Sequence, residues 1–149
     1  MTIDAADGGQ ETTVAIVDDE PSVRVSLRRL CNALGMCATA YASGRAFLDA
    51  LESGEARPDC LLLDIQMPGM TGFEVQRHLV ARDVRIPTII VTADDAPEAR
   101  ARCAAAGAVE TLRKPIGADE LIAAIERAVR PRLSDPSFGD SAIATRRQR

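Results

Sequence analysis

Residues 13–19 read Thr-Val-Ala-Ile-Val-Asp-Asp, a short apolar and β-branched run that ends in two carboxylates. Its length and composition predict a buried β-strand over residues 13–17. Cys60-Leu61-Leu62-Leu63 is a second such run, and Asp64 follows it at once. A strand with no polar alternation is typical of a sheet that is covered by helices on both faces. Both runs therefore predict strands of a buried parallel sheet, each with a carboxylate at its end.

The rest of the chain alternates between short apolar runs and helical patterns. Pro21 lies in the first turn of a helix that is predicted to reach Leu34 and to stop at Gly35. Residues 71–74, Thr-Gly-Phe-Glu, form a capping-box pattern that opens a helix toward Leu79. Further strands are predicted over 37–41, 87–91 and 108–112, and further helices around 46–51, from Asp95 to Gly107, and over 121–129.

Five strand–helix units with short connections predict an α/β fold, in which a parallel sheet lies between two layers of helices. For a sheet of this size we expect the flavodoxin-like (βα)5 three-layer sandwich with strand order 2-1-3-4-5. We expect the folded domain to cover residues 12–131, after a disordered leader over 1–11 and before a flexible tail over 132–149. The predicted strand order reverses between the first and third strands, which leaves a crevice there.

Composition excludes several classes of function. The chain has 149 residues and is 46% hydrophobic, which is enough for one domain with its own core. A net charge of −4 and few aromatic residues, one Tyr and three Phe, argue against direct binding of nucleic acid. No apolar run reaches the ~18–20 residues that a membrane span needs, and the first residues lack a signal-peptide pattern. We therefore expect a cytoplasmic protein without membrane contact.

The four cysteines, Cys31, Cys37, Cys60 and Cys103, are widely spaced and lie in apolar surroundings. Their spacing suits neither a metal site nor a disulfide framework. We expect reduced, buried cysteines that pack as small apolar residues.

Polar residues follow four of the five predicted strands. Asp18 and Asp19 follow the first strand, and Asp64, Thr92 and Lys114 follow the third, fourth and fifth. Ligands of open α/β sheets bind outside the carboxyl ends of the strands, at the point where the strand order reverses. The sequence therefore predicts that three carboxylates, one hydroxyl and one ammonium group meet at one edge of the sheet.

Three carboxylates in a small crevice repel one another unless a cation compensates them. Mg²⁺ is commonly held by one or two carboxylates, waters and phosphate oxygens, and Mn²⁺ prefers similar ligands. Lys114, the only lysine in the sequence, can balance the remaining negative charge. These residues together predict a Mg²⁺ (or Mn²⁺) site at this edge of the sheet.

At this point the sequence resembles a known family. Four motifs resemble those of the receiver domains of bacterial two-component response regulators, and the resemblance covers roughly residues 12–130. The sequences of these motifs are similar to those of receivers that precede LuxR-type helix-turn-helix domains. We find no helix-turn-helix pattern in this sequence, so we expect a stand-alone regulator. The motifs are Val-Asp-Asp-Glu-Pro over 17–21, Leu-Asp-Ile-Gln-Met-Pro-Gly-Met-Thr-Gly over 63–72, Val-Thr-Ala over 91–93 and Lys114-Pro115.

The resemblance implies a role for each site residue. Asp64 would accept a phosphoryl group from a histidine kinase or phosphotransfer protein. Asp18 and Asp19 would hold Mg²⁺ together with the Asp64 carboxylate and the Gln66 backbone carbonyl. Thr92 and Lys114 would bind phosphoryl oxygens after the transfer. The protein would thus be a self-catalysing phosphoryl acceptor and no turnover enzyme.

Phosphorylation would then change binding to a protein target, or to a second copy, through the surface formed by the fourth helix, fifth strand and fifth helix. Receivers often carry an aromatic residue three positions before their lysine, and here this position is Thr111. Thr92 and Thr111 would be the switch residues. Because Thr111 has no ring to rotate, we predict that phosphorylation causes a smaller conformational change, or one that acts through dimerisation.

In receivers the positions of Gln66 and Asp94 line the path of the hydrolytic water, so these residues are expected to tune the lifetime of the phosphorylated form.

Three other functions compete with this interpretation. The chain could be the receiver of a transcriptional regulator whose DNA-binding output domain is missing or is a separate protein. It could be an enzyme on the same fold. A flavin-binding protein is disfavoured, because the acidic run after the first strand would repel the phosphate of the flavin. A haloacid-dehalogenase-type phosphatase would carry Asp-x-Asp after this strand, whereas this chain carries Asp18-Asp19. It could also be a degenerate receiver that only scaffolds, against which the complete set of site residues argues.

Overall fold

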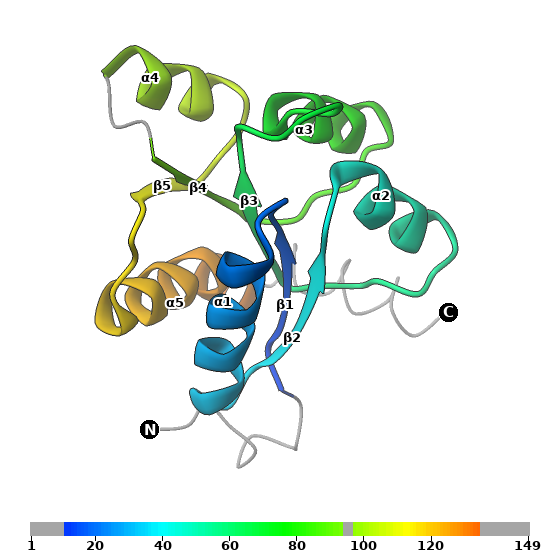
Figure 1. Ribbon diagram of the computed structural model, residues 1–149. Coiled ribbons are helices and arrows are strands. Elements are labelled where there is room, and N and C mark those ends of the chain that lie inside the picture. Colours follow the sequence, from blue (N-terminus) through cyan, green and yellow to red (C-terminus); the bar gives the residue numbers. More distant parts are fainter. Residues whose placement is uncertain (1–10, 94–96, 135–149) are drawn as a thin grey trace.

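The computed structural model describes residues 11–93 and 97–134 (Figure 1). The five strands are β1 (Thr13–Val17), β2 (Cys37–Tyr41), β3 (Cys60–Asp64), β4 (Thr88–Thr92) and β5 (Glu110–Arg113). The five helices are α1 (Pro21–Ala33), α2 (Gly44–Glu52), α3 (Gly72–Ala81), α4 (Pro97–Ala105) and α5 (Ala118–Ser134). Among the described helices, none combines the length and the apolar character needed to cross a bilayer.

The sheet has the order β2-β1-β3-β4-β5, and every neighbouring pair of strands is parallel. Helices α1 and α5 cover one face of the sheet, and α2, α3 and α4 cover the other (Figure 1). This arrangement confirms the predicted three-layer α/β fold and its strand order.

Two apolar clusters, one on each side of the sheet, form the core. Alternate residues of a strand point to opposite faces, so Ile16 packs toward α1 and α5, whereas Val17 packs toward Phe47 and Leu79 of α2 and α3. All five residues of β3 are buried, because this strand lies at the centre of the sheet between both clusters. The rigid central strands β1 and β3 therefore fix the positions of the residues that follow them.

Helix ends follow the signals in the sequence. The predicted capping box is present at α3: the Glu74 carboxylate accepts from the Thr71 N–H at 2.8 Å, and the Thr71 hydroxyl accepts from the Glu74 N–H at 3.2 Å. Gly35 and Gly107 follow α1 and α4 with φ of +88° and +102°, a conformation that favours glycine.

Several boundaries differ from the sequence prediction. The strand predicted over 108–112 begins only at Glu110, because the Ala108 N–H is still bound to the Cys103 carbonyl at the end of α4. The strand predicted to begin at Pro87 begins at Thr88. Helix α5 continues to Ser134, three residues beyond the boundary predicted at 131. The predicted leader up to residue 10 and the tail from residue 135 lie outside the described residues.

The prediction of four buried cysteines was wrong for one of them. Cys31, Cys60 and Cys103 are buried free thiols, but Cys37 is exposed. Cys37 is the first residue of β2, and β2 is an edge strand that is only partly covered. An apolar neighbourhood in the sequence did not reveal that this strand lies at the edge.

Candidate functional site

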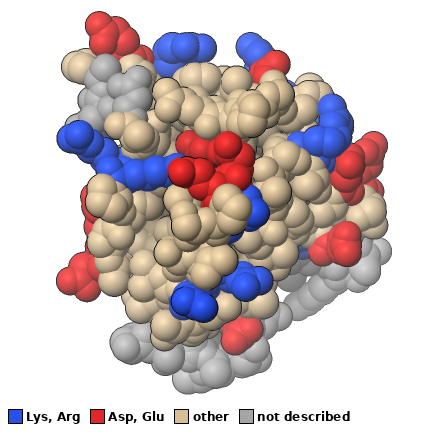
Figure 2. Space-filling view, viewed as in Figure 1, with Lys and Arg blue, Asp and Glu red and all other residues tan. Residues whose placement is uncertain are grey.

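The candidate site lies at the carboxyl edge of the sheet. Asp18 and Asp19 follow β1, Asp64 is the last residue of β3, Thr92 is the last residue of β4, and Lys114 follows β5. Because all five strands are parallel, these ends meet at one edge. Figure 2 shows acidic side chains gathered near the centre of this face of the molecule, with basic side chains beside them.

Three carboxylates converge at this edge. One oxygen from each of Asp18, Asp19 and Asp64 lies within 4.8 Å of the other two. The side chains of Asp18 and Asp64 are withdrawn from solvent, with residue exposures of 2% and 5%, and Asp19 is half-buried. A compact set of carboxylate oxygens is the donor set that a hard divalent cation such as Mg²⁺ takes. The residues present therefore fit the metal expected from the sequence.

Lys114 bridges the acidic residues. Its Nζ lies 2.9 Å from Oδ2 of Asp18, 3.6 Å from Oδ2 of Asp64 and 3.7 Å from Oε1 of Glu20. The backbone N–H of Lys114 donates to the Thr92 carbonyl at 2.9 Å, and the peptide bond to Pro115 is cis. The end of β5 thus holds the ammonium group between the carboxylates that follow β1 and β3.

Burial changes the acid–base behaviour of Asp64. Desolvation is the largest cause that raises the pKa of Asp64 to about 6, and the negative charges of Asp18 and Asp19 add to it. The Lys114 ammonium and the Gln66 N–H, which donates to Oδ1 at 3.4 Å, oppose this rise of the pKa. In the metal-free site Asp64 therefore binds its proton more tightly than an exposed aspartate.

The pKa of Lys114 is also raised, but by its acidic neighbours rather than by burial. Desolvation acts to lower the pKa of Lys114, but the hydrogen bond to Asp18 and the charges of Asp64, Asp18 and Glu20 together outweigh it, so the pKa is raised. Lys114 therefore carries its positive charge at neutral pH.

Local hydrogen bonds orient Asp18. Its Oδ1 accepts from the Glu20 N–H at 2.9 Å, which closes the turn between β1 and α1. One guanidinium nitrogen of Arg24, in the first turns of α1, donates to the Asp18 carbonyl at 2.8 Å. Glu20 and Arg24 received no role from the sequence. Glu20 adjoins the Asp18-Asp19 pair, but nothing in the sequence indicated that its carboxylate reaches Lys114.

Gly72 lies directly against the backbone of Asp64. A Cβ added at Gly72 would lie 2.5 Å from the Asp64 carbonyl oxygen and 2.9 Å from Cα of Ile65. The Gly72 N–H also donates to the Ile65 carbonyl at 3.0 Å. The first turn of α3 is thus packed so closely on the end of β3 that only glycine fits, a requirement that we did not derive from the sequence.

The remaining predicted residues lie around this centre. Thr92 is buried, with 1% exposure, and is in register with Arg113 of β5. Thr111 is half-buried on the same strand, in register with Ile90. Gln66 is exposed just beyond β3. Asp94 lies outside the described residues, so its predicted place beside the site stays a prediction.

A cavity of about 750 Å³ opens between α3 and α4 next to this site. Gln66 and Thr92 line its inner end, and Phe73 and Arg102 line it farther out. The Arg102 guanidinium carbon lies 4.2 Å from the centroid of the Phe73 ring, which joins α4 to α3. The site is therefore accessible from the side on which α3 and α4 begin.

Comparison with known proteins agrees with this geometry. The family model described as "Response regulator receiver domain" matches residues 14–126. The chain is 36% identical over 132 residues to the response regulator MprA of Mycolicibacterium vanbaalenii, which covers 89% of this chain and 56% of MprA. It is 39% identical over 114 residues to the DNA-binding transcriptional regulator NtrC of Klebsiella pneumoniae, which covers 76% of this chain and 24% of NtrC. The chain thus spans only about a quarter to a half of the length of these relatives.

Solved structures show the same fold. A crystal structure of a response regulator receiver protein from Burkholderia phymatum is 41% identical, with a TM-score of 0.73, and the match covers 80% of this chain and 95% of that one. The crystal structure of FixJ-N is 36% identical, with a TM-score of 0.74, and the match covers 81% of this chain and 95% of that one. The family resemblance noted in the sequence is thereby confirmed.

Proposed function

Since the chain belongs to the response regulator receiver domain family of two-component signalling, we propose that Asp64 accepts a phosphoryl group from a histidine kinase or a phosphotransfer protein. One observation carries this proposal: the buried Asp64 carboxylate lies beside Asp18 and Asp19 and within 3.6 Å of the Lys114 ammonium. This is the charge arrangement that phosphoryl transfer requires, because that reaction depends on positioning and on neutralising charge.

In the transfer, a carboxylate oxygen of Asp64 attacks the phosphorus of a phosphohistidine. The new O–P bond forms as the N–P bond breaks, and the imidazole nitrogen of the donor keeps the electron pair and takes up a proton. The product is an acyl phosphate, which hydrolyses readily and therefore suits a timed signal. The protein acts on itself in this step and is no turnover enzyme.

Receiver domains typically bind Mg²⁺, and the residues that would hold it here are Asp18, Asp19, Asp64 and the Gln66 backbone carbonyl. When bound, Mg²⁺ (or Mn²⁺) would neutralise negative charge on the phosphoryl oxygens. Asp18 would then divide its interactions between the cation and Lys114, to which it lies at 2.9 Å. Asp19 is the least buried of the three aspartates and would hold the cation from the solvent side.

Lys114 and Thr92 would bind the transferred group. Lys114 already lies between Asp18 and Asp64, so its ammonium needs only a short movement to pair with a phosphoryl oxygen. The Thr92 hydroxyl can donate to a second oxygen from the end of β4. Thr92 ends β4 and Lys114 follows the neighbouring strand β5. The Lys114 N–H donates to the Thr92 carbonyl, so the movements of the two residues are linked.

The readout follows from the added charge of roughly −1.5 to −2. Movement of Thr92 and Lys114 toward the phosphoryl group would shift α4, β5 and α5, and would change how this surface binds a protein target or a second copy of the chain. Thr111 has no ring to rotate, so we propose a small displacement of β5. Gln66 and Asp94 would set how readily water reaches the acyl phosphate.

The free thiols support a cytoplasmic location. Cys31, Cys60 and Cys103 are buried free cysteines, and free cysteines are typical of proteins in a reducing compartment. We propose that the phosphoryl transfer takes place there.

A second candidate function rests on the relatives. NtrC is described as a DNA-binding transcriptional regulator and FixJ of Bradyrhizobium diazoefficiens as a transcriptional regulatory protein. The chain could accordingly act as the receiver of a transcriptional regulator whose DNA-binding output domain lies elsewhere in the gene or on a separate protein. Reading the gene beyond codon 149 decides between the two candidates, because a helix-turn-helix segment there would favour the second.

Labelling with a radioactive small phosphodonor such as acetyl phosphate tests the proposed chemistry. We expect Mg²⁺-dependent incorporation in the wild-type chain and none in Asp64→Ala. Asp49→Ala is the matched control, since Asp49 is an exposed aspartate within α2. Equal labelling of the wild type and Asp64→Ala, or no labelling of either, would count against the proposal.

A further inference from the structure

Glu20 is a fourth carboxylate at the candidate site. It follows Asp18 and Asp19 directly, and its Oε1 lies 3.7 Å from Nζ of Lys114. The Glu20 side chain is 60% exposed, whereas the side chains of Lys114 and Asp18 are 18% and 2% exposed. Glu20 therefore contacts Lys114 from the solvent side, while the buried Asp18 and Asp64 contact it from the inner side.

The Glu20 carboxylate has no part in the start of α1. Glu20 is the N-cap residue of this helix, a position where a side-chain oxygen usually accepts from the first turn, but its side chain makes no such bond. Its backbone makes the local contacts: the N–H donates to Oδ1 of Asp18, and the carbonyl accepts from the Arg24 N–H at 3.1 Å. Removal of the Glu20 charge should therefore leave the fold intact.

The charge of Glu20 is also not needed to balance the site. A bound divalent cation and the Lys114 ammonium would together match the three aspartates, so Glu20 adds a negative charge beyond that balance. In an in-line phosphoryl transfer the leaving group departs on the side away from the attacking oxygen. Because Asp64 is buried, that side faces the solvent, and Glu20 lies there.

We propose that Glu20 is a specificity-determining residue that favours phosphodonors with a nitrogen leaving group, such as phosphohistidine, over acyl phosphates. This inference rests on the proposed phosphorylation of Asp64. When phosphohistidine is the donor, the N–P bond breaks, and the imidazole keeps the electron pair, takes up a proton and leaves without a negative charge. When acetyl phosphate is the donor, the O–P bond breaks, and acetate leaves with the electron pair and a negative charge. The Glu20 carboxylate repels the forming acetate and does not repel the imidazole.

Initial rates of labelling with acetyl phosphate and with N-phosphoimidazole test this role. The two probes transfer the same phosphoryl group and differ in the leaving group. Glu20→Gln keeps the size of the side chain and removes its charge, so we expect the ratio of the acetyl phosphate rate to the N-phosphoimidazole rate to rise roughly 3- to 10-fold. Glu52→Gln, at an exposed position at the end of α2, is the matched control and should keep the wild-type ratio.

Salt and a conservative variant separate the effect of charge from an effect on structure. The Debye length falls from about 10 Å at 0.1 M salt to about 3 Å at 1 M, which screens an exposed carboxylate. The difference in rate ratio between the wild type and Glu20→Gln should therefore shrink at 1 M NaCl. Glu20→Asp keeps the charge and should keep a ratio close to that of the wild type.

The NMR signal of Lys114 provides a readout that does not depend on phosphorylation. Lys114 is the only lysine in the sequence, so the full chain grown with ¹³C- and ¹⁵N-labelled lysine gives the side-chain signals of this residue alone. Since Glu20 contacts the Lys114 ammonium, we expect these signals to shift in metal-free Glu20→Gln and to stay in place in Glu52→Gln. Identical signals in the wild type and Glu20→Gln would overturn the contact on which the inference depends.

The labelling outcomes distinguish this inference from the proposed function. An unchanged rate ratio in Glu20→Gln would overturn the role of Glu20 and leave the phosphorylation of Asp64 standing, even if both rates changed by the same factor. Failure of both probes to label the wild-type chain would overturn the proposed function, and the inference with it.

Discussion

At Gly72 the first turn of α3 and the end of β3 touch through their backbones. The 2.5 Å between an added Cβ and the Asp64 carbonyl oxygen is shorter than any ordinary contact, and backbone atoms cannot rotate away as a side chain can. Gly72 is therefore a determinant of where the Asp64 carboxylate lies.

Gly72→Ala tests this packing. Alanine in a helix is usually favourable by up to about 1 kcal/mol relative to glycine, but here we expect a net loss of about 1–3 kcal/mol in the free energy of unfolding and slower labelling of Asp64. Denaturant unfolding and a labelling time course measure the two effects. Gly117→Ala is the control, since nothing lies within 4 Å of its added Cβ. A neutral or stabilising Gly72→Ala would contradict the account of this contact.

The raised pKa of Asp64 predicts a pH-dependent stability of the metal-free protein. Asp64 has a pKa of about 6 in the folded state against 3.8 for an unperturbed aspartate. The folded state therefore holds the proton more tightly, and the stability that this provides is lost as the pH rises through the range from about 4 to 6. Above that range the buried charge destabilises the fold by roughly 3 kcal/mol.

Asp64→Asn, which carries no charge, should thus gain stability relative to the wild type by about 3 kcal/mol between pH 4 and pH 7 in the presence of a chelator. Urea unfolding at several pH values measures this difference. A difference that stays constant with pH would show that burial of the Asp64 charge has no energetic cost.

The sequence predicted which charged residues meet at the carboxyl edge of the sheet, but not the residues that position them. Asp18, Asp64 and Lys114 could be brought together in advance, because the carboxyl ends of parallel strands share one edge of the sheet. The roles of Glu20 and Gly72 could not be predicted in this way. The contact of the Glu20 side chain with Lys114, and the close approach of the Gly72 backbone to Asp64, both depend on tertiary packing. The charges of the residues and the ends of the strands can be predicted from the sequence, whereas the distances between atoms in the site cannot.

Among the helices, α4 has few contacts with the core. Cys103 is its one residue in the buried class, so the stacking of Arg102 on Phe73 of α3 holds α4 at a second point. A helix with few buried contacts can shift at low cost, which suits the surface that we propose as the readout.

A double-mutant cycle with Arg102→Ala and Phe73→Leu tests this link. We expect a coupling of about 0.5–1 kcal/mol in the free energy of unfolding, which is the range for a cation over an exposed ring. Hydrogen exchange of the α4 amides should also rise in Arg102→Ala, with Arg82→Ala as the control on the exposed end of α3. Additive effects of the two substitutions would mean that the pair contributes nothing to the position of α4.

The elements were largely predictable and their ends less so. The two all-apolar strands and the capping box of α3 came from local patterns that tertiary structure preserves. The start of β5 was placed two residues early, because Ala108 is apolar like a strand residue but donates its N–H to the end of α4. The same residues can end a helix or begin a strand. Which of the two they do depends on their backbone hydrogen bonds, and the residue types alone do not predict these bonds.

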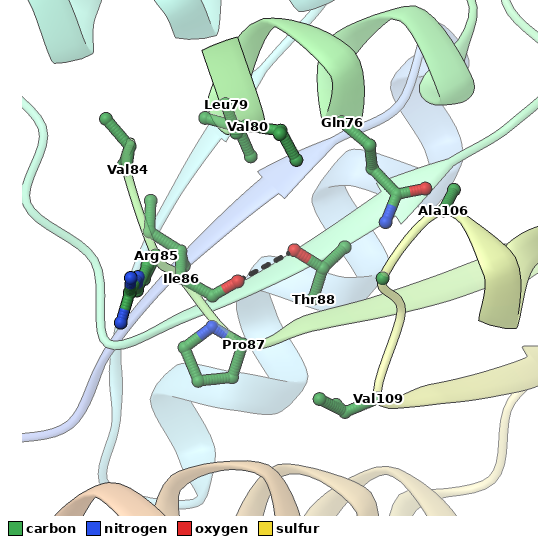
Figure 3. Close-up of a pocket in the computed structure, with 11 residues that line it drawn as sticks. Gln76, Leu79, Val80, Val84, Arg85, Ile86, Pro87, Thr88, Ala106 and Val109 are labelled. Carbon is green, nitrogen blue, oxygen red and sulfur yellow. Dashed lines mark hydrogen bonds between the residues drawn. The ribbon is translucent and has the colours of Figure 1, made fainter. Parts of the chain in front are cut away.

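At the scale of the molecule, the two edges of the parallel sheet differ in character. The acidic site lies at the carboxyl edge, and a mainly apolar pocket lined by Val80 and Val109 lies at the amino edge (Figure 3). Because all the strands are parallel, the ends of β1, β3, β4 and β5 lie on the same side of the fold.

Cation binding should stabilise the whole chain. A ligand that binds only the folded state adds about 2.7 kcal/mol at one hundred times its Kd, so we expect Mg²⁺ to raise the unfolding temperature relative to the protein in chelator. Asp19→Asn should lose most of this increase, because it removes one of three carboxylates, and Asp83→Asn should retain it. Thermal unfolding followed by circular dichroism provides the measurement, and the same increase in Asp19→Asn would place the cation elsewhere.

Direct location of the phosphoryl group is the decisive measurement. An aspartyl phosphate is reduced by borohydride to homoserine, and peptide mass spectrometry identifies the residue that was converted. After incubation with acetyl phosphate and Mg²⁺ we predict homoserine at position 64 and nowhere else, and none when the cation is chelated. Conversion of another aspartate, or intact Asp64 under conditions in which the chain becomes labelled, would contradict the assignment of Asp64 as the phosphoryl acceptor.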